Sequence, residues 1–183
     1  MITVRKLDPA AAERLLNDLV GLLCDAVAGG ASLGFLLPLE RAEALAYWES
    51  VALAMRAGCR DLLVALADQR LVGAVQLDLE PRANGRHRAE LMKLMVLRAA
   101  RRRGIGRALM CAALDAARAA GRSLVLLDVR AGDPAEALYR ELGFIRIGEV
   151  PRYARSPDGR LAASRFYYLE LPPRPGEGGH QPP

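Results

Sequence analysis

Hydrophobic residues recur along the chain with two periods, and the order in which these periods alternate predicts the order of the secondary-structure elements. Apolar or alternating runs of strand length occupy residues 2–7, 61–67, 71–79, 89–97, 123–129, 144–150 and 164–171. Apolar side chains at helical spacing occupy residues 10–28, 40–57, 104–120 and 134–142. We therefore expect a mixed sheet with helices on its faces, an α/β fold in the broad sense.

Capping and turn residues predict where these elements begin and end. Asp133-Pro134-Ala135-Glu136 has the pattern of a capping box, with proline at the first helical position. Ser156-Pro157-Asp158-Gly159 is a turn within the long segment that joins the last two strands. Residues 172–183 consist largely of proline and glycine and are expected to be disordered, which leaves residues 1–171 as a single domain.

Composition narrows the function classes. No apolar run reaches 18 residues and no signal peptide is recognisable, so we expect a cytoplasmic protein without a membrane partner. The net charge of +5 reflects arginines spread over most of the chain, and no aromatic and basic face indicates a nucleic-acid partner. The three cysteines and two histidines are far apart, which predicts neither a metal site nor a histidine-based triad.

The segment Arg101-Arg102-Arg103-Gly104-Ile105-Gly106-Arg107 lies between the predicted strand at 89–97 and a predicted helix, and this order predicts an anion site. The first N–H groups of a helix have no intrahelical partner and carry partial positive charge, so they can hold a pyrophosphate. Glycines 104 and 106 allow close approach of the main chain, and the arginines offer bidentate phosphate contacts. The alternative is a surface loop of solvated arginines. A Rossmann loop or a Walker loop fits less well, because Gly-x-Gly-x-x-Gly and Gly-Lys-Ser/Thr are both lacking.

Two segments together resemble a known enzyme family. Residues 94–106 resemble motif A of the GNAT N-acetyltransferase superfamily, and residues 135–144, Ala-Glu-Ala-Leu-Tyr-Arg-Glu-Leu-Gly-Phe, are similar to its motif B. Further segments at 88–90, 131–132 and 156–161 are similar to the tabtoxin-resistance acetyltransferase branch. The resemblance implies a mixed, mostly antiparallel sheet of about seven strands with helices on both faces, and acetyl-CoA as cosubstrate.

In that family the motif A main chain meets the pyrophosphate and the preceding strand pairs with the pantetheine arm. The resemblance thus implies that the cosubstrate is bound by Met95, Val96, Leu97, Arg101, Arg102, Arg103, Gly104, Ile105, Gly106 and Arg107. Arg98 stands where the family often has proline, and it either contacts the 3′-phosphate or faces water. Gly132 replaces an asparagine that often contacts the cofactor.

Acetyl transfer to an amine needs a base for the amine and an acid for the departing thiolate, but no enzyme nucleophile. By resemblance, Tyr139 is the thiolate acid, with core packing as its structural alternative. Asp128, at the end of an apolar strand, is our first choice for the ammonium contact or base. Glu90 is the second choice, taking the proton through water, with a surface glutamate as the alternative.

The N-terminal helices commonly wall the acceptor pocket in this fold, which makes Phe35 and Trp48 candidate substrate-binding residues, with core packing as the alternative for each. We expect transfer to the amine of a small molecule, such as a toxin or antibiotic, in a ternary complex, and a homodimer, as in many small acetyltransferases of this kind. The alternatives are acetylation of a protein N-terminus or lysine, and a non-catalytic acyl-CoA-binding module.

Overall fold

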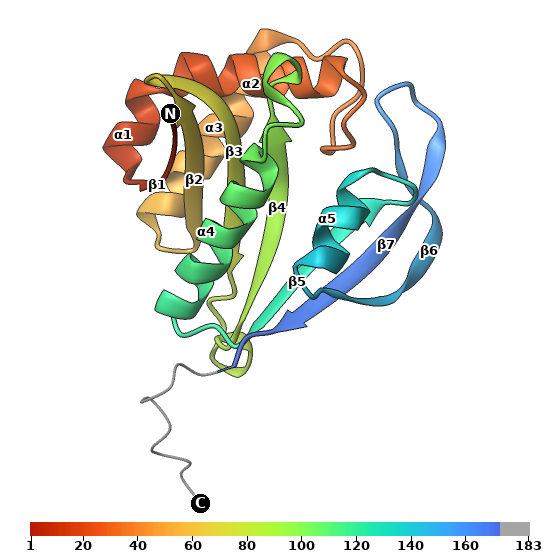
Figure 1. Cartoon of the computed structure of the whole chain (residues 1–183). Coiled ribbons are helices and arrows are strands. Elements are labelled where there is room, and N and C mark those ends of the chain that lie inside the picture. Colours follow the sequence, from red (N-terminus) through yellow and green to blue (C-terminus); the bar gives the residue numbers. More distant parts are fainter. Residues whose placement is uncertain (173–183) are drawn as a thin grey trace, which may run out of the picture.

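A single seven-stranded sheet organises the molecule, which a computed structural model describes over residues 1–172 (Figure 1). The strand order is β1-β2-β3-β4-β5-β7-β6, and every neighbouring pair is antiparallel except β4 with β5. The strands are β1 (Ile2–Leu7), β2 (Arg60–Ala67), β3 (Arg70–Leu79), β4 (Arg88–Val96), β5 (Leu124–Arg130), β6 (Ile145–Arg155) and β7 (Leu161–Glu170). The expected mixed, mostly antiparallel sheet is confirmed. The tail predicted at 172–183 lies outside the described residues, apart from Pro172.

Helices cover both faces of the sheet, because strand residues alternate between two apolar cores. Leu62 and Val64 face one core with α1 (Pro9–Arg14), α2 (Leu16–Ala28) and α3 (Arg41–Arg56). Leu63 and Ala65 face the other core with α4 (Ile105–Ala119) and α5 (Ala135–Glu141). The two faces therefore present different elements to anything bound within the sheet.

Two predicted boundaries are wrong. The helix expected over residues 10–28 is broken at Leu15, whose N–H is shared between the carbonyls of Ala11 and Ala12, so α1 packs along β1 while α2 packs on β3 and β4. The long segment between the last two strands is mostly strand, because β6 continues to Arg155 and pairs with β7 up to the turn at 156–159. β6 and β7 thus form one long hairpin.

The sheet opens at its centre, where β4 and β5 run parallel for only three residue pairs. These pairs are Arg88 with Leu124, Ala89 with Val125 and Glu90 with Leu126. Beyond them the strands diverge, and Figure 1 shows β1–β4 and β5–β7 as two arms that separate from this point. A space between two diverging parallel strands can admit an extended ligand whose backbone-like groups pair with a strand edge.

Candidate active site

A cleft of about 980 Å³ occupies the space where β4 and β5 diverge. Its wall is formed by β4, the start of α4, β5, α5 and the loop after α2. Of the predicted cosubstrate-binding residues, the wall contains Met95, Val96, Arg101, Arg102, Gly104, Ile105, Gly106 and Arg107, and does not include Leu97 or Arg103. The structure therefore brings most of the predicted motif A residues to one cleft.

The start of α4 has the geometry of an anion site. Gly104 is the N-cap with φ +77°, a left-handed conformation, and no side chain of the described residues caps the helix. Arg102 also has a positive φ, +62°. The first N–H groups of α4 are thus left for a ligand, and the arginines in the cleft wall add positive charge beside them. This arrangement fits the pyrophosphate of a coenzyme A group.

Three arginines around this loop are held by the protein. Arg107 pairs with Glu141 of α5, and the Arg101 Nε donates to the Val96 carbonyl at 3.2 Å. Arg98 donates to Asp25 of α2, from its Nε at 2.8 Å and its backbone N–H at 2.9 Å. Burial acts to raise the pKa of Asp25, but these Arg98 hydrogen bonds hold it below its usual value. The Arg98 side chain is therefore neither directed at a phosphate site nor free in solvent. Its hydrogen bonds to Asp25 connect the start of motif A to α2.

The two predicted carboxylates lie on the sheet face that also carries α3. Asp128 lines the cleft and accepts a hydrogen bond from the Ser164 hydroxyl at 2.7 Å. Glu90 is the last β4 residue that pairs with β5, lies opposite Asp78 of β3, and is outside the cleft wall. Partial burial, with the carboxylates of Asp128 and Asp78, raises the pKa of Glu90. A carboxyl group with a raised pKa is suited to accept a proton near neutral pH.

Tyr139 reaches the cleft from the opposite side of the sheet. Its ring packs against Phe144 and Tyr167, with centroid distances of 6.1 and 6.2 Å, and only 7% of the residue is exposed. Within residues 1–172 its hydroxyl has no hydrogen-bond partner. Burial, with the carboxylates of Asp133 and Asp128, raises the pKa of Tyr139, so the hydroxyl stays protonated and can donate a proton into the cleft.

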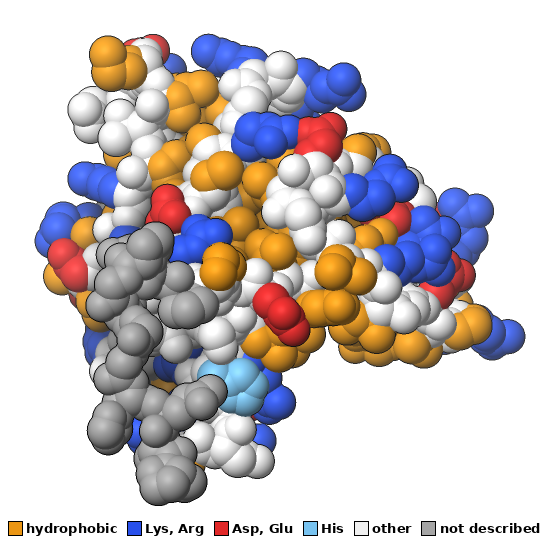
Figure 2. Space-filling model, turned by 60° about the horizontal axis from the view of Figure 1, so that its bottom comes forward, with side chains coloured by type: hydrophobic (Ala, Val, Ile, Leu, Met, Phe, Trp, Pro, Cys, Tyr) orange, Lys and Arg blue, Asp and Glu red, His pale blue; other side chains and the backbone are white. Residues whose placement is uncertain are grey.

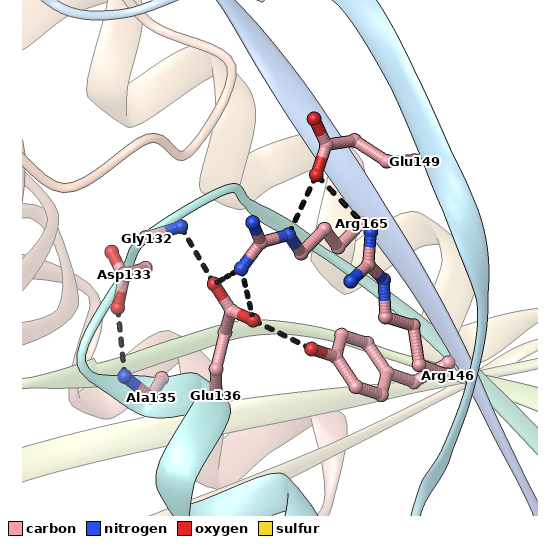
Figure 3. A network of polar contacts seen from close by, with 8 residues as sticks. Gly132, Asp133, Ala135, Glu136, Arg146, Glu149 and Arg165 are labelled. Carbon is pink, nitrogen blue, oxygen red and sulfur yellow. Dashed lines mark hydrogen bonds and ion pairs between the residues drawn. The ribbon is translucent and has the colours of Figure 1, made fainter.

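A buried polar network fixes the helix that carries Tyr139 (Figure 3). Glu136, one turn before Tyr139, accepts hydrogen bonds from the Tyr167 hydroxyl at 2.6 Å and from Arg165 at 2.9 Å. It also accepts one from the Gly132 N–H at 2.6 Å, while Asp133 accepts from the Ala135 N–H at 3.0 Å. The predicted capping residues are thus used, although α5 begins one residue later than expected and Glu136 reaches back past Asp133 to Gly132.

This network also changes the acidity of its carboxyl group. Burial acts to raise the pKa of Glu136, but the hydrogen bonds from Tyr167, Arg165 and Gly132 outweigh it and lower the pKa to about 2. Arg165 in turn contacts Glu149 of β6 at 2.8 Å. Glu136 therefore stays ionised and ties α5 to the β6–β7 hairpin.

The structure places the two aromatic candidates apart from the cleft wall. Trp48 is 2% exposed and packs in the core beneath α2 and α3. Phe35 packs edge-on against Tyr47 at a centroid distance of 5.3 Å, and Tyr47 packs against Trp48 at 5.4 Å. Both side chains thus pack beside Tyr47 of α3 and do not line the cleft.

Three residues near the cleft were missed by the sequence reasoning. Lys93 lies in the cleft wall at a bulge of β4, and Arg130 extends from the end of β5 to the loop after α2. Gln76, fully buried on β3, exchanges hydrogen bonds with the Tyr47 hydroxyl at 2.9 and 3.1 Å. For Lys93 a signal existed, because it is one of only two lysines in a chain with 24 arginines.

A mixed sheet split between parallel β4 and β5, with an anion site at the following helix, defines a protein that binds an acyl-CoA within its sheet. Residues 27–144 match the acetyltransferase (GNAT) family, and the chain belongs to that family. It is therefore an N-acetyltransferase, and the expected enzyme class and acetyl-CoA cosubstrate are confirmed.

Solved structures agree with this assignment. The ribosomal-protein-alanine N-acetyltransferase of Brucella melitensis is 25% identical with a TM-score of 0.76, over 92% of this chain and 99% of that one. A GCN5-related N-acetyltransferase from Kribbella flavida is 24% identical with a TM-score of 0.76, over 93% and 98% of the two chains. The yncA protein of Salmonella typhimurium, whose structure contains acetyl-CoA, is 21% identical with a TM-score of 0.73, over 93% and 94%.

The described part of the chain lacks two structural features. Residues 1–172 contain no helix of the length and hydropathy needed to cross a membrane. Over the same residues, no group of three or more histidine, cysteine or acidic side chains could hold a metal ion.

Proposed function

We propose that this acetyltransferase transfers the acetyl group of acetyl-CoA to the amine of a small molecule, directly and within a ternary complex. One observation carries the proposal: a single cleft connects the anion site at α4 with Asp128 on one face of the sheet and Tyr139 on the other. An acceptor that enters beside Asp128 can thus meet a thioester held between the two diverging strands.

The chain's own groups divide the binding of acetyl-CoA between main chain and side chains. The α4 N–H groups from Gly104 to Gly106 suit the pyrophosphate, and Arg101, Arg102 and Arg107, which line the cleft, suit the remaining phosphate charge. The end of β4 at Met95 and Val96 offers main-chain groups to the pantetheine arm. Bound in this way, acetyl-CoA supplies a thioester carbon that an amine can attack.

Two carboxylates and one phenol then handle protons. Asp128 contacts the ammonium group of the acceptor, and Glu90 takes the proton through water, because its raised pKa makes its carboxylate a stronger base than that of an ordinary glutamate. Tyr139 donates its proton to the departing thiolate, and its raised pKa keeps that proton available. Asp128 and Tyr139 in the wall of one cleft, with Glu90 where the β4–β5 pairing ends, favour turnover over a non-catalytic acyl-CoA-binding module.

A screen of amine acceptors tests the proposal. Purified protein is incubated with acetyl-CoA and a panel of amines, amino acids and aminated antibiotics, and released thiol is followed spectroscopically. We expect saturable CoA release with at least one small amine, together with tight acetyl-CoA binding in calorimetry. If acetyl-CoA fails to bind, or if no amine of the panel stimulates CoA release, the proposed function is wrong.

Acetylation of a protein N-terminus is the second candidate, favoured by the likeness to the Brucella melitensis ribosomal-protein-alanine enzyme. A panel that includes short peptides with N-terminal alanine separates the two, since a peptide enzyme would prefer them over free small amines by a large factor in kcat/KM. The resemblance to the tabtoxin-resistance branch supports a toxin or antibiotic amine as the small acceptor.

We also propose a cytoplasmic homodimer that does not bind nucleic acid. The edge strand β6 exposes apolar side chains that a second copy could cover, among them Ile145 at 54% and Ile147 at 60% exposure. On the face shown in Figure 2, basic side chains alternate with acidic and apolar ones, which offers no continuous track for a phosphate backbone. Light scattering after gel filtration measures the oligomeric state.

A further inference from the structure

Lys93 is an unusual residue in this chain and an unusual side chain in this cleft. Of the 26 basic residues, all but Lys6 and Lys93 are arginine. Lys6 lies at the surface and pairs with Asp61 at 2.7 Å. Lys93 instead lines the cleft between the two arms, and among residues 1–172 it forms no ion pair. The cleft thus contains a lysine without a direct ion-pair partner among the described residues.

The backbone of β4 is bent to place this side chain. Ala74 pairs with Met95 and Gln76 with Met92, so two residues of β4, Lys93 and Leu94, oppose one residue of β3. Lys93 has φ +54°, a left-handed conformation that is costly for a residue with a side chain. This bulge turns the Lys93 ammonium toward α3, where it lies 6.0 Å from the centre of the Tyr47 ring.

The ammonium group is also partly removed from water. Burial lowers the pKa of Lys93 even though the carboxylates of Asp128 and Glu90 act to raise it, and Arg60 adds to the lowering. A half-buried cation that no carboxylate contacts directly is unfavourable, and an anionic ligand group would relieve that cost through a charge-assisted hydrogen bond. The same carboxylates are the groups to which the acceptor amine is assigned above.

We propose that Lys93 binds a carboxylate of the acceptor, so that the substrates of this enzyme are amines that also carry a carboxylate, as amino acids do. This inference rests on the proposed function, because it describes the acceptor of the same acetyl transfer. An ammonium group between Asp128 and Glu90 and a carboxylate at Lys93 would match the charges of the site at both ends. A simple alkylamine would leave the Lys93 ammonium without a direct anionic partner.

Matched acceptor pairs and matched variants test this assignment. The common L-amino acids and their α-carboxamides are compared as acceptors by CoA release, with the wild-type protein, Lys93→Met and Lys93→Arg. Each acceptor's intrinsic reactivity is the same with every protein, so the change in the acid-to-amide ratio of kcat/KM isolates the contribution of Lys93. Thermal unfolding of each variant verifies that it is folded.

We expect the wild type to prefer acids and Lys93→Met to lose that preference by about 10-fold, mainly through KM, as for one charge-assisted hydrogen bond. Lys93→Arg should keep part of the preference, because it keeps the charge. Equal use of acids and amides by the wild type, or an unchanged preference in Lys93→Met, overturns the role of Lys93 and leaves acetyl transfer intact. Absence of CoA release with every amine overturns both.

Discussion

At the scale of single residues, the Tyr139 hydroxyl can be removed without disturbing its ring. Tyr139→Phe keeps the packing against Phe144 and Tyr167 and removes only the proposed proton donor. We expect kcat to fall by about 100-fold, as for the loss of a general acid, with the Kd for acetyl-CoA changed less than about 2-fold. Tyr168→Phe, on β7 and outside the cleft wall, is the matched control. Equal losses of turnover and acetyl-CoA affinity in Tyr139→Phe would indicate packing instead.

Glu90 gives a prediction in which activity and stability move in opposite directions. Its pKa is raised in the folded protein by partial burial, Asp128 and Asp78, so the carboxylate forms over a higher pH range than in an ordinary glutamate. We expect kcat/KM to rise through that range, and Glu90→Gln to lower kcat/KM by at least about 10-fold and to remove this limb.

The sign of the stability effect follows from the same shift. A raised folded-state pKa favours the protonated form, so its contribution is present below the unfolded pKa and is lost as pH rises through the folded value. Glu90→Gln should therefore unfold at the same temperature as the wild type at low pH and at a slightly higher temperature at pH 8. Thermal melts at several pH values measure this, and a lower melting temperature at pH 8 would contradict it.

At the scale of elements, the anion site at the start of α4 can be tested by comparing substitutions at the two ends of this helix. Gly104, with φ +77°, caps the start of α4, and Gly121, with φ +68°, follows its end; an added Cβ has open space at both. Gly104→Ala and Gly121→Ala should each lower the free energy of unfolding by about 1–2 kcal/mol, because both impose left-handed strain. Only Gly104→Ala should weaken CoA binding, by about 5-fold in calorimetry, since it displaces the N–H groups of the anion site. Equal CoA binding by the two variants would rule out this site.

The attachment of α5 to the hairpin depends on Glu136. Glu136→Gln should lower the free energy of unfolding by about 1–3 kcal/mol at pH 7, because it weakens charge-assisted hydrogen bonds to Arg165 and Gly132 in a buried site. The folded pKa of about 2 lies below the unfolded value, so this stabilisation is present above pH 4.5 and is lost as pH falls toward 2. Urea titrations at pH 7 and pH 3 should thus show a smaller difference between wild type and variant at the lower pH. A difference independent of pH would show that the charge of Glu136 is not what holds α5.

These elements also show which parts of the site the sequence could predict. Gly104, Tyr139 and Glu136 lie within continuous segments whose local pattern gives both the element and the position in it. The surroundings of Trp48 and Lys93 could not be predicted in this way. For Trp48, helical spacing does not tell which neighbouring element the side chain contacts. For Lys93, a bulge in β4 breaks the simple alternation of strand residues between the two sheet faces. The splay of β4 from β5 likewise depends on pairing between residues more than 30 positions apart, such as Glu90 and Leu126.

At the scale of the whole molecule, Arg130 joins the two arms across the cleft. From the end of β5 its Nη1 donates to the Gly30 carbonyl at 3.0 Å and to the Ser156 hydroxyl at 3.4 Å. Beside it, the Leu37 N–H donates to the Pro157 carbonyl at 2.9 Å. The loop after α2, which belongs to one arm, is thus tied to the tip of the β6–β7 hairpin, which belongs to the other.

Loss of this tie should loosen the acceptor side of the cleft while leaving the anion site at α4 in place. We expect Arg130→Met to raise the acceptor KM by about 10-fold and to change the acetyl-CoA Kd less than about 2-fold. Arg160→Met is the matched control, because Arg160 lies on the same hairpin tip but, within residues 1–172, its side chain pairs only with Asp158 of its own turn. Arg130 also lines the cleft, so kinetics alone would not separate a tie from a direct acceptor contact. Amide hydrogen exchange of the free protein separates these two roles. Faster exchange at residues 30–38 and 156–160 in Arg130→Met establishes that Arg130 holds the two arms together. Unchanged exchange with a raised KM establishes a direct contact with the acceptor instead.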